Sequence, residues 1–153
     1  MPHIHDKIDF TVEVFIVYKD RVLLRMHDKH KIWLSVGGHI ELDEDPVEGA
    51  RREVREEVGL EIDIVGDIPK FEDDNYSYLV APRFLGKHIV NDSHTHVVLV
   101  YFAKAKDDNI KDPHHDHEKT EVIWATMEDL GKMDLRPNVR HLAEEALKEL
   151  GEK

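Results

Sequence analysis

The chain has 153 residues, no cysteine and a formal net charge of −12. Its length favours a single domain over residues 1–153, and the lack of cysteine excludes disulfides, thiolate metal sites and cysteine nucleophiles. The acidic balance argues against bulk binding to nucleic acid or an anionic membrane, and without a leader-like N-terminus or a long apolar stretch we expect a cytoplasmic protein.

The first part of the chain predicts a hairpin and a short strand. Residues 9–18 (DFTVEVFIVY) are rich in β-branched and aromatic residues, and a tight turn leads into a second strand over residues 21–27. Arg25 lies in that second strand, where it could reach a substrate phosphate; a solvated strand end is the alternative reading. Residues 33–36 (WLSV) predict a short strand that runs directly into the glycine pair Gly37–Gly38.

Residues 46–58 predict an amphipathic helix. A proline opens this segment, acidic capping candidates precede it and a glycine follows it. Glu53, Glu56 and Glu57 fall at i, i+3 and i+4 beside its apolar stripe. Like charges at this spacing repel unless a cation lies among them, and clustered carboxylate oxygens suit Mg²⁺ or Mn²⁺. A solvated acidic face is the alternative.

The remaining sequence predicts further strands and two helical segments. We expect strands over residues 60–65, 75–81, 97–105 and 121–125, a helical turn over residues 126–130 closed by Gly131, and a final helix from Pro137 to Gly151. Residues 97–105 (VVLVYFAKA) are continuously apolar, which indicates an interior strand covered on both faces. Helices on both sides of such strands predict an α+β fold with both sheet faces covered.

The segment from Gly38 to Leu60 resembles the Nudix box at every defined position. The matching residues are Gly38, Glu44, Arg52–Val54, Glu56–Glu57 and Gly59–Leu60. One departure lies just outside the segment, because Val36 stands where the family usually has a proline before the double glycine. The resemblance implies a Nudix α/β/α sandwich with a mixed β-sheet, and hydrolysis of a diphosphate linkage in a nucleoside diphosphate derivative.

The resemblance also implies a divalent metal site on the box. The expected metal ligands, which include the base, are Glu53, Glu56, Glu57 and the carbonyl group of Gly37. We favour Glu53 as the base, and expect Arg52 and Glu44 to form a supporting pair that orients the helix. The metal would be Mg²⁺, with Mn²⁺ as a substitute, since a hard cation neutralises diphosphate charge while a carboxylate activates water.

Candidates for substrate binding lie outside the box. Tyr76 and Tyr78 share a face of the expected strand at residues 75–81, at about the distance past the box where some Nudix enzymes that cleave dinucleoside polyphosphates carry a base-stacking tyrosine. Packing against a neighbouring strand is the alternative. His94 and His96 also share a strand face; they could bind metal or phosphate, or be solvated.

The polar loop at residues 106–118 and the strand after it offer the last candidates. Some Nudix enzymes take a base or an extra metal ligand from the corresponding loop, and the candidates here are His115, His117, Glu118 and Glu121. A solvated loop is the alternative. We favour Glu121 as the ligand because it opens an expected strand and would be held better than a loop residue.

The resemblance leaves several substrates and one other function class open. The substrate could be a nucleoside triphosphate, a dinucleoside polyphosphate or a nucleotide sugar, and the protein could act as a homodimer. The alternative function is a non-catalytic Nudix domain that senses a nucleotide or binds a protein. Such domains often lose box carboxylates, whereas this chain keeps them all.

Overall fold

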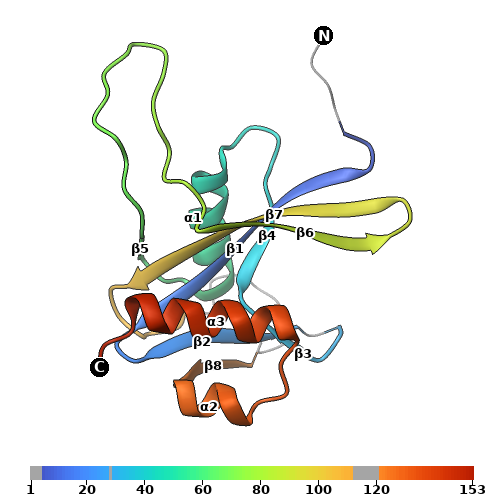
Figure 1. The fold of residues 1–153 in the computed structure, drawn as a ribbon, viewed down its shortest axis with the longest axis vertical. Coiled ribbons are helices and arrows are strands. Elements are labelled where there is room, and N and C mark those ends of the chain that lie inside the picture. The colour runs from blue at the N-terminus through green and yellow to red at the C-terminus, as the bar shows by residue number, and fades with distance from the viewer. Residues whose placement is uncertain (1–4, 28, 112–120) are drawn as a thin grey trace.

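A computed structural model describes residues 5–27, 29–111 and 121–153, in which one sheet is flanked by helices (Figure 1). The strands are β1 (Ile8–Tyr18), β2 (Arg21–His27), β3 (Ile32–Leu34), β4 (Val36–His39), β5 (Ile62–Ile64), β6 (Phe84–Asn91), β7 (His94–Ala105) and β8 (Val122–Ala125). The helices are α1 (Pro46–Val58), α2 (Met127–Lys132) and α3 (Pro137–Leu150).

The sheet is mixed, as the sequence predicts. Its main path is β3-β2-β1-β7-β5, while β4 pairs with β1, β6 with β7 and β8 with β2. The pair β1–β7 is parallel and the other pairs are antiparallel. The two longest strands, β1 and β7, therefore lie side by side at the centre, which confirms the expected interior position of residues 97–105.

Alternate residues of β1 enter two different cores, because successive side chains of a strand point to opposite faces. Val14 and Ile16 pack in a cluster with residues of α1, whereas Phe15 and Val17 pack in a second cluster with residues of α2 and α3. Helices thus cover both faces of the sheet, and the α+β sandwich is confirmed. None of the helices in the described residues is long and apolar enough to cross a membrane.

Helix α1 begins and ends where the sequence predicts. The side chain of Asp45 accepts a hydrogen bond from the backbone N–H of Glu48 at 2.9 Å, and proline occupies the first turn. Gly59 closes the helix with φ of 64°, a left-handed conformation that glycine adopts at little cost.

The expected strand at residues 75–81 is wrong. Residues 65–83 contain neither helix nor strand, and the next strand in the chain is β6, at Phe84–Asn91, which pairs with β7. The side chains of β6 are largely exposed, with Leu85 69% exposed, so its sequence carries no alternating apolar pattern. Backbone pairing with β7 stabilises β6 instead.

Two smaller expectations also need correction. The expected strand at residues 33–36 is two short strands separated by Ser35, since β3 pairs with β2 and β4 pairs with β1. Gly131 does not close the second helix: α2 continues through it to Lys132. A capping box between Thr126 and Asp129 starts that helix.

Candidate active site

Arg52 connects Glu44, which precedes α1, to Glu53 and Glu56 within that helix. Its Nη2 and Nε atoms donate to the two carboxylate oxygens of Glu44 at 2.7 and 3.0 Å, and Nη2 also donates to the His39 carbonyl at 2.9 Å. Its Nη1 atom donates to Glu53 at 3.0 Å and to Glu56 at 3.1 Å. The hydrogen bonds with Glu44 are the main reason that the pKa of Arg52 is raised and the pKa of Glu44 is lowered.

Gly38 lets a box carboxylate lie directly against β4, while Gly37 lets β4 lie close to β1. A Cβ atom on Gly37 would overlap the carbonyl oxygen of Val12, and a Cβ atom on Gly38 would overlap the carboxylate of Glu53. The Glu53 carboxylate therefore lies against the Gly38 backbone, in space that only glycine leaves open.

Glu57 is a shielded carboxylate with one basic partner. Its side chain is 14% exposed and forms an ion pair with Arg25 of β2, while its Oε1 atom accepts a long hydrogen bond of 3.4 Å from the Gly37 N–H. Burial raises the pKa of Glu57 to about 8; the charge of Arg25 opposes this rise and Glu53 adds to it. The ion pair with Arg25 is made by Glu57 Oε2, and among the described residues this atom accepts no hydrogen bond of normal geometry.

These carboxylates fit a hard divalent cation. Glu53, Glu56 and Glu57 present only oxygen donors, which Mg²⁺ and Mn²⁺ prefer. Arg52 already neutralises part of the charge on Glu53 and Glu56, and Arg25 neutralises part of the charge on Glu57 through an ion pair with its Oε2 atom. A cation beside the three carboxylates would complete the charge balance.

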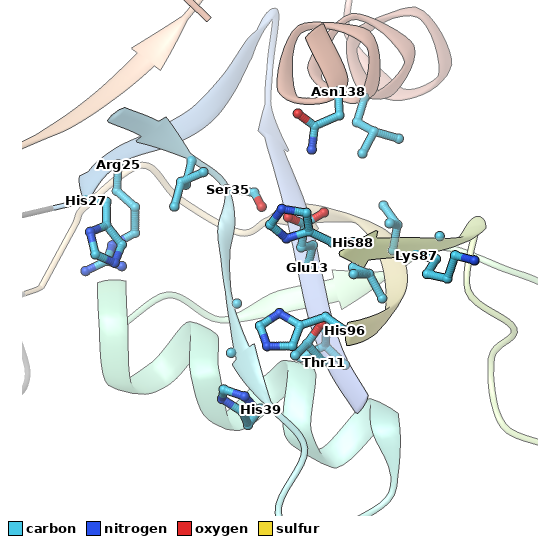
Figure 2. Close-up of a pocket in the computed structure, with 18 residues that line it drawn as sticks. Thr11, Glu13, Arg25, His27, Ser35, His39, Lys87, His88, His96 and Asn138 are labelled. Carbon is cyan, nitrogen blue, oxygen red and sulfur yellow. The ribbon is translucent and has the colours of Figure 1, made fainter. Parts of the chain in front are cut away.

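A cavity of about 490 Å³ adjoins the box on the side of the sheet that carries α3 (Figure 2). Its polar lining consists of Thr11, Glu13, Arg25, His27, Ser35, His39, Lys87, His88, His96 and Asn138. The glycine pair also lines it, whereas the box glutamates do not. Gly37–Gly38 and Arg25 therefore connect the carboxylate cluster to a cavity of the size that small ligands occupy.

Glu13 is the cavity carboxylate that the sequence analysis missed. It lines the cavity from β1, and His88 of β6 and Asn138 of α3 also line it (Figure 2). Burial raises the pKa of Glu13. One signal could have revealed this residue, because it is the only charged side chain between Asp9 and Tyr18 of an otherwise apolar strand.

The two predicted histidines of β7 lie beside the cavity. His96 lines it, and the Nε2 atoms of His94 and His96 are 3.0 Å apart. Burial, followed by the nearby charges of His39 and His94, lowers the pKa of His96. His39 follows the glycine pair directly, and its position inside the box segment did not single it out by sequence.

The two predicted tyrosines do not reach the cavity. Tyr76 and Tyr78 lie in the irregular segment 65–83, are 57% and 44% exposed, and are absent from the cavity lining. Their rings pack edge to face with each other, at 5.4 Å between centroids, and with Phe71. The expectation that they share a strand face is wrong, because no strand forms there.

The candidates near residue 121 are only partly described. His115, His117 and Glu118 lie outside the described residues. Glu121 is exposed, and its backbone carbonyl accepts a hydrogen bond from the Met26 N–H at 2.8 Å. It thus lies beside β2, close in register to Arg25.

Comparison with known proteins identifies the family. The NUDIX domain profile matches residues 9–149. A solved NUDIX-family hydrolase from Clostridium perfringens is 35% identical, with a TM-score of 0.80 and coverage of 92% of this chain and 96% of that chain. No curated protein matches.

More distant structures share the fold. The MutT protein from Methanosarcina mazei Go1 is 22% identical, with a TM-score of 0.61 and coverage of 96% of this chain and 98% of that chain. A NUDIX hydrolase from Nitrosomonas europaea is 17% identical, with a TM-score of 0.65 and coverage of 94% and 90%. Because the profile spans most of the chain and the first relative exceeds 30% identity over nearly its whole length, the chain belongs to the Nudix hydrolase family.

Proposed function

We propose that the protein is a Mg²⁺-dependent pyrophosphohydrolase that cleaves a diphosphate linkage in a nucleoside diphosphate derivative. Membership of the Nudix hydrolases supplies the reaction class, hydrolysis of a phosphoric anhydride bond. One observation carries the proposal for this chain. The Glu53 carboxylate lies against the backbone of Gly38, and Gly38 also lines the cavity.

In this proposal the box holds the metal and the chain orients it. Glu53, Glu56, Glu57 and the Gly37 carbonyl would bind Mg²⁺, with Mn²⁺ as a substitute. When bound, the cation neutralises charge on the diphosphate and lowers the barrier to attack by water. Arg52 keeps two of these carboxylates in place through hydrogen bonds of 3.0 and 3.1 Å, and its bidentate contact with Glu44 ties the helix to the preceding loop.

In this proposal a box glutamate accepts the proton of the attacking water, and residues of the cavity contact the substrate. We assign Glu53 as the base that accepts a proton from the attacking water, because its carboxylate lies against the backbone of Gly38, which lines the cavity. Arg25 offsets the burial of Glu57 and favours its ionised form. We assign the contacts with the rest of the substrate to His88, His96 and Asn138, because these three residues line the cavity (Figure 2).

The substrate class within the family is open to three candidates: a nucleoside triphosphate, a dinucleoside polyphosphate and a nucleotide sugar. The exposed positions of Tyr76 and Tyr78 weaken the argument for dinucleoside polyphosphates, which depended on those rings. Glu121 is retained as an additional metal ligand in the proposal, because it directly precedes β8 and lies next to β2 and Arg25. The family match over residues 9–149 supports one catalytic domain.

The test is hydrolysis of a nucleotide panel in Mg²⁺ by the wild type and by Glu57→Gln. We expect turnover of at least one panel member, with phosphate or pyrophosphate release showing which phosphorus is attacked. Glu57→Gln should lower kcat by about 100-fold or more, because a carboxylate of the charged cluster is lost. Circular dichroism checks that the fold survives.

The matched control is Glu48→Gln, an exposed glutamate on the same helix, which should leave kcat unchanged. Equal activity of Glu57→Gln and wild type in a metal-dependent assay would overturn the assignment of Glu57. Nucleotide binding without turnover of any panel member would favour a sensing domain instead.

A further inference from the structure

A second group of metal-ligating side chains lies apart from the box glutamates, although one member, His39, belongs to the box segment. Asp9, His39, His94 and His96 each place one donor atom so that all four atoms lie within 4.8 Å of one another. Their chemistry differs from that of the proposed Mg²⁺ ligands, which are only carboxylate and carbonyl oxygens. Three imidazoles and one carboxylate suit a first-row transition ion rather than Mg²⁺.

Strand register brings these four residues to one face of the sheet. Asp9 on β1 pairs with His96 on β7, and His94 lies two residues before His96, so both histidines point to the same side. His39 ends β4, where it pairs with Thr11, two residues after Asp9. Three neighbouring strands therefore build the group, which gives it a firmer scaffold than a loop would.

The distances between donor atoms match those of ligands that share one ion. His94 Nε2 lies 2.9 Å from Asp9 Oδ2 and 3.0 Å from His96 Nε2, and His39 Nε2 lies 3.5 Å from Asp9 Oδ2. Zn²⁺ binds imidazole nitrogen at about 2.0–2.1 Å, so tetrahedral geometry separates two ligand atoms by about 3.3 Å. These three separations scatter around that value, and the remaining pairs of donor atoms lie within 4.8 Å of each other.

Hydrogen bonding explains only part of this arrangement. A neutral imidazole has one N–H, so the Nε2 atom of His94 can donate to Asp9 or to His96 but cannot satisfy both fully. Protonating all three rings would instead place several positive charges around one carboxylate. A divalent cation would accept lone pairs from the three rings and the carboxylate together.

We infer that Asp9, His39, His94 and His96 form a binding site for a divalent transition-metal ion, with Zn²⁺ as the representative ligand. The side chains of Asp9, His39 and His94 are 38%, 60% and 31% exposed, so an ion can enter from solvent. His39 and His96 also line the cavity (Figure 2), so the ion would add positive charge to its wall at the end away from Arg25 and His27.

The test is Zn²⁺ binding by the full chain after metal removal with a chelator, measured by calorimetry in excess Mg²⁺. The excess Mg²⁺ occupies oxygen sites and leaves imidazole sites available, because imidazole prefers transition metals. We expect one Zn²⁺ per chain. Visible absorption of Co²⁺ in the same site should report four-coordinate nitrogen and oxygen ligation.

Variants separate this site from the box and from other histidines. His94→Asn with His96→Asn should weaken Zn²⁺ binding by at least about 100-fold, since even loss of an outer-shell contact costs 10–100-fold. Asp9→Asn changes one atom and removes the charge, so it should weaken binding while sparing the fold. His141→Asn, at an exposed position of α3, is the matched control and should bind like wild type.

Glu53→Gln with Glu56→Gln should also keep Zn²⁺ binding, so the new site can succeed or fail independently of the proposed hydrolysis. If the wild type binds no Zn²⁺, or if His94→Asn with His96→Asn and Asp9→Asn bind Zn²⁺ as tightly as wild type, the inference is overturned. The group would then be a hydrogen-bonded histidine cluster only.

Discussion

At the scale of single residues, the absence of a side chain at Gly38 decides where a carboxylate can lie. Glu53 reaches the backbone of β4 because nothing occupies that space, and Arg52 holds the same carboxylate from the other side at 3.0 Å. Two independent restraints thus position Glu53. Positioning of this kind is what catalysis by carboxylates requires, since small displacements of a reacting group slow a reaction strongly.

Gly38→Ala should therefore uncouple activity from folding. The added methyl group would overlap the Glu53 carboxylate, a side chain that can rotate away, so we expect kcat to fall by about 100-fold while the chain remains folded. Steady-state kinetics and thermal unfolding measure the two effects. Gly131→Ala is the control, because its new Cβ would meet nothing within 4 Å and alanine favours the helix. A fully active Gly38→Ala would show that catalysis does not require the Glu53 carboxylate to lie against the Gly38 backbone.

Glu13 makes the stability of the apo protein depend on pH. Burial raises its pKa in the folded state above that in the unfolded chain. The folded state therefore holds this proton more tightly, and the resulting stability is fully present below the unfolded pKa and is lost as pH rises through the folded pKa. Glu13→Gln cannot ionise, so it should be more stable than wild type at alkaline pH.

Urea unfolding over a pH series, in chelator, measures this difference. The advantage of Glu13→Gln should shrink as pH falls, because the wild-type carboxyl group is then neutral as well. Glu72→Gln, at an exposed position, should show no such trend. A stability difference that stays constant with pH would mean that ionisation of Glu13 is not its cause.

At the scale of elements, local signals explain which predictions succeed. Helix α1 has an acidic N-cap, a proline in its first turn and a glycine at its end, and each signal acts within a few residues. Its bounds are therefore readable from the sequence. The hairpin of β1 and β2 is also local, with Lys19 in the turn at φ of 56°.

Strand β6 escaped prediction because its stability is not local. Its side chains are mostly exposed and it lies beside β7 through backbone hydrogen bonds, so its own sequence shows no periodic apolar pattern. Residues 75–81 carry aromatic and β-branched residues but find no strand partner. The cavity lining was also not predictable from local sequence. His88 lines the cavity because it lies on β6, a strand that the sequence did not predict.

Sequence spacing could identify the box residues but not the residues from other strands that contact the candidate sites. The i, i+3 and i+4 spacing fixes how Glu53, Glu56 and Glu57 lie on one helix. By contrast, Arg25 meets Glu57 through the packing of β2 against α1, and Asp9 meets His96 through the parallel pairing of β1 with β7. Contacts between distant segments depend on the whole fold.

At the scale of the whole molecule, one sheet supplies both cores. Strands β1 and β7 contribute alternate residues to the cluster under α1 and to the cluster under α2 and α3. Loss of either strand would remove both clusters at once. We therefore expect the described body to unfold in a single cooperative transition.

The two tryptophans allow each face to be followed separately. Trp124 packs against the α1 cluster and Trp33 packs against the α3 cluster. Trp33→Phe leaves a fluorescent probe on the α1 side only, and Trp124→Phe leaves one on the α3 side only. Their thermal transitions in chelator should share one midpoint if the cores unfold together.

Addition of Mg²⁺ should then raise both midpoints equally, although the proposed metal site lies on the α1 side alone. A ligand that binds only the folded state stabilises it by about 2.7 kcal/mol at 100 times its Kd, and a cooperative fold shares that stabilisation across both faces. Glu56→Gln in each single-tryptophan protein should reduce the shift. If only the Trp124 signal moved, the α1 half would unfold independently, and metal binding could order the box without stabilising the α3 wall of the cavity.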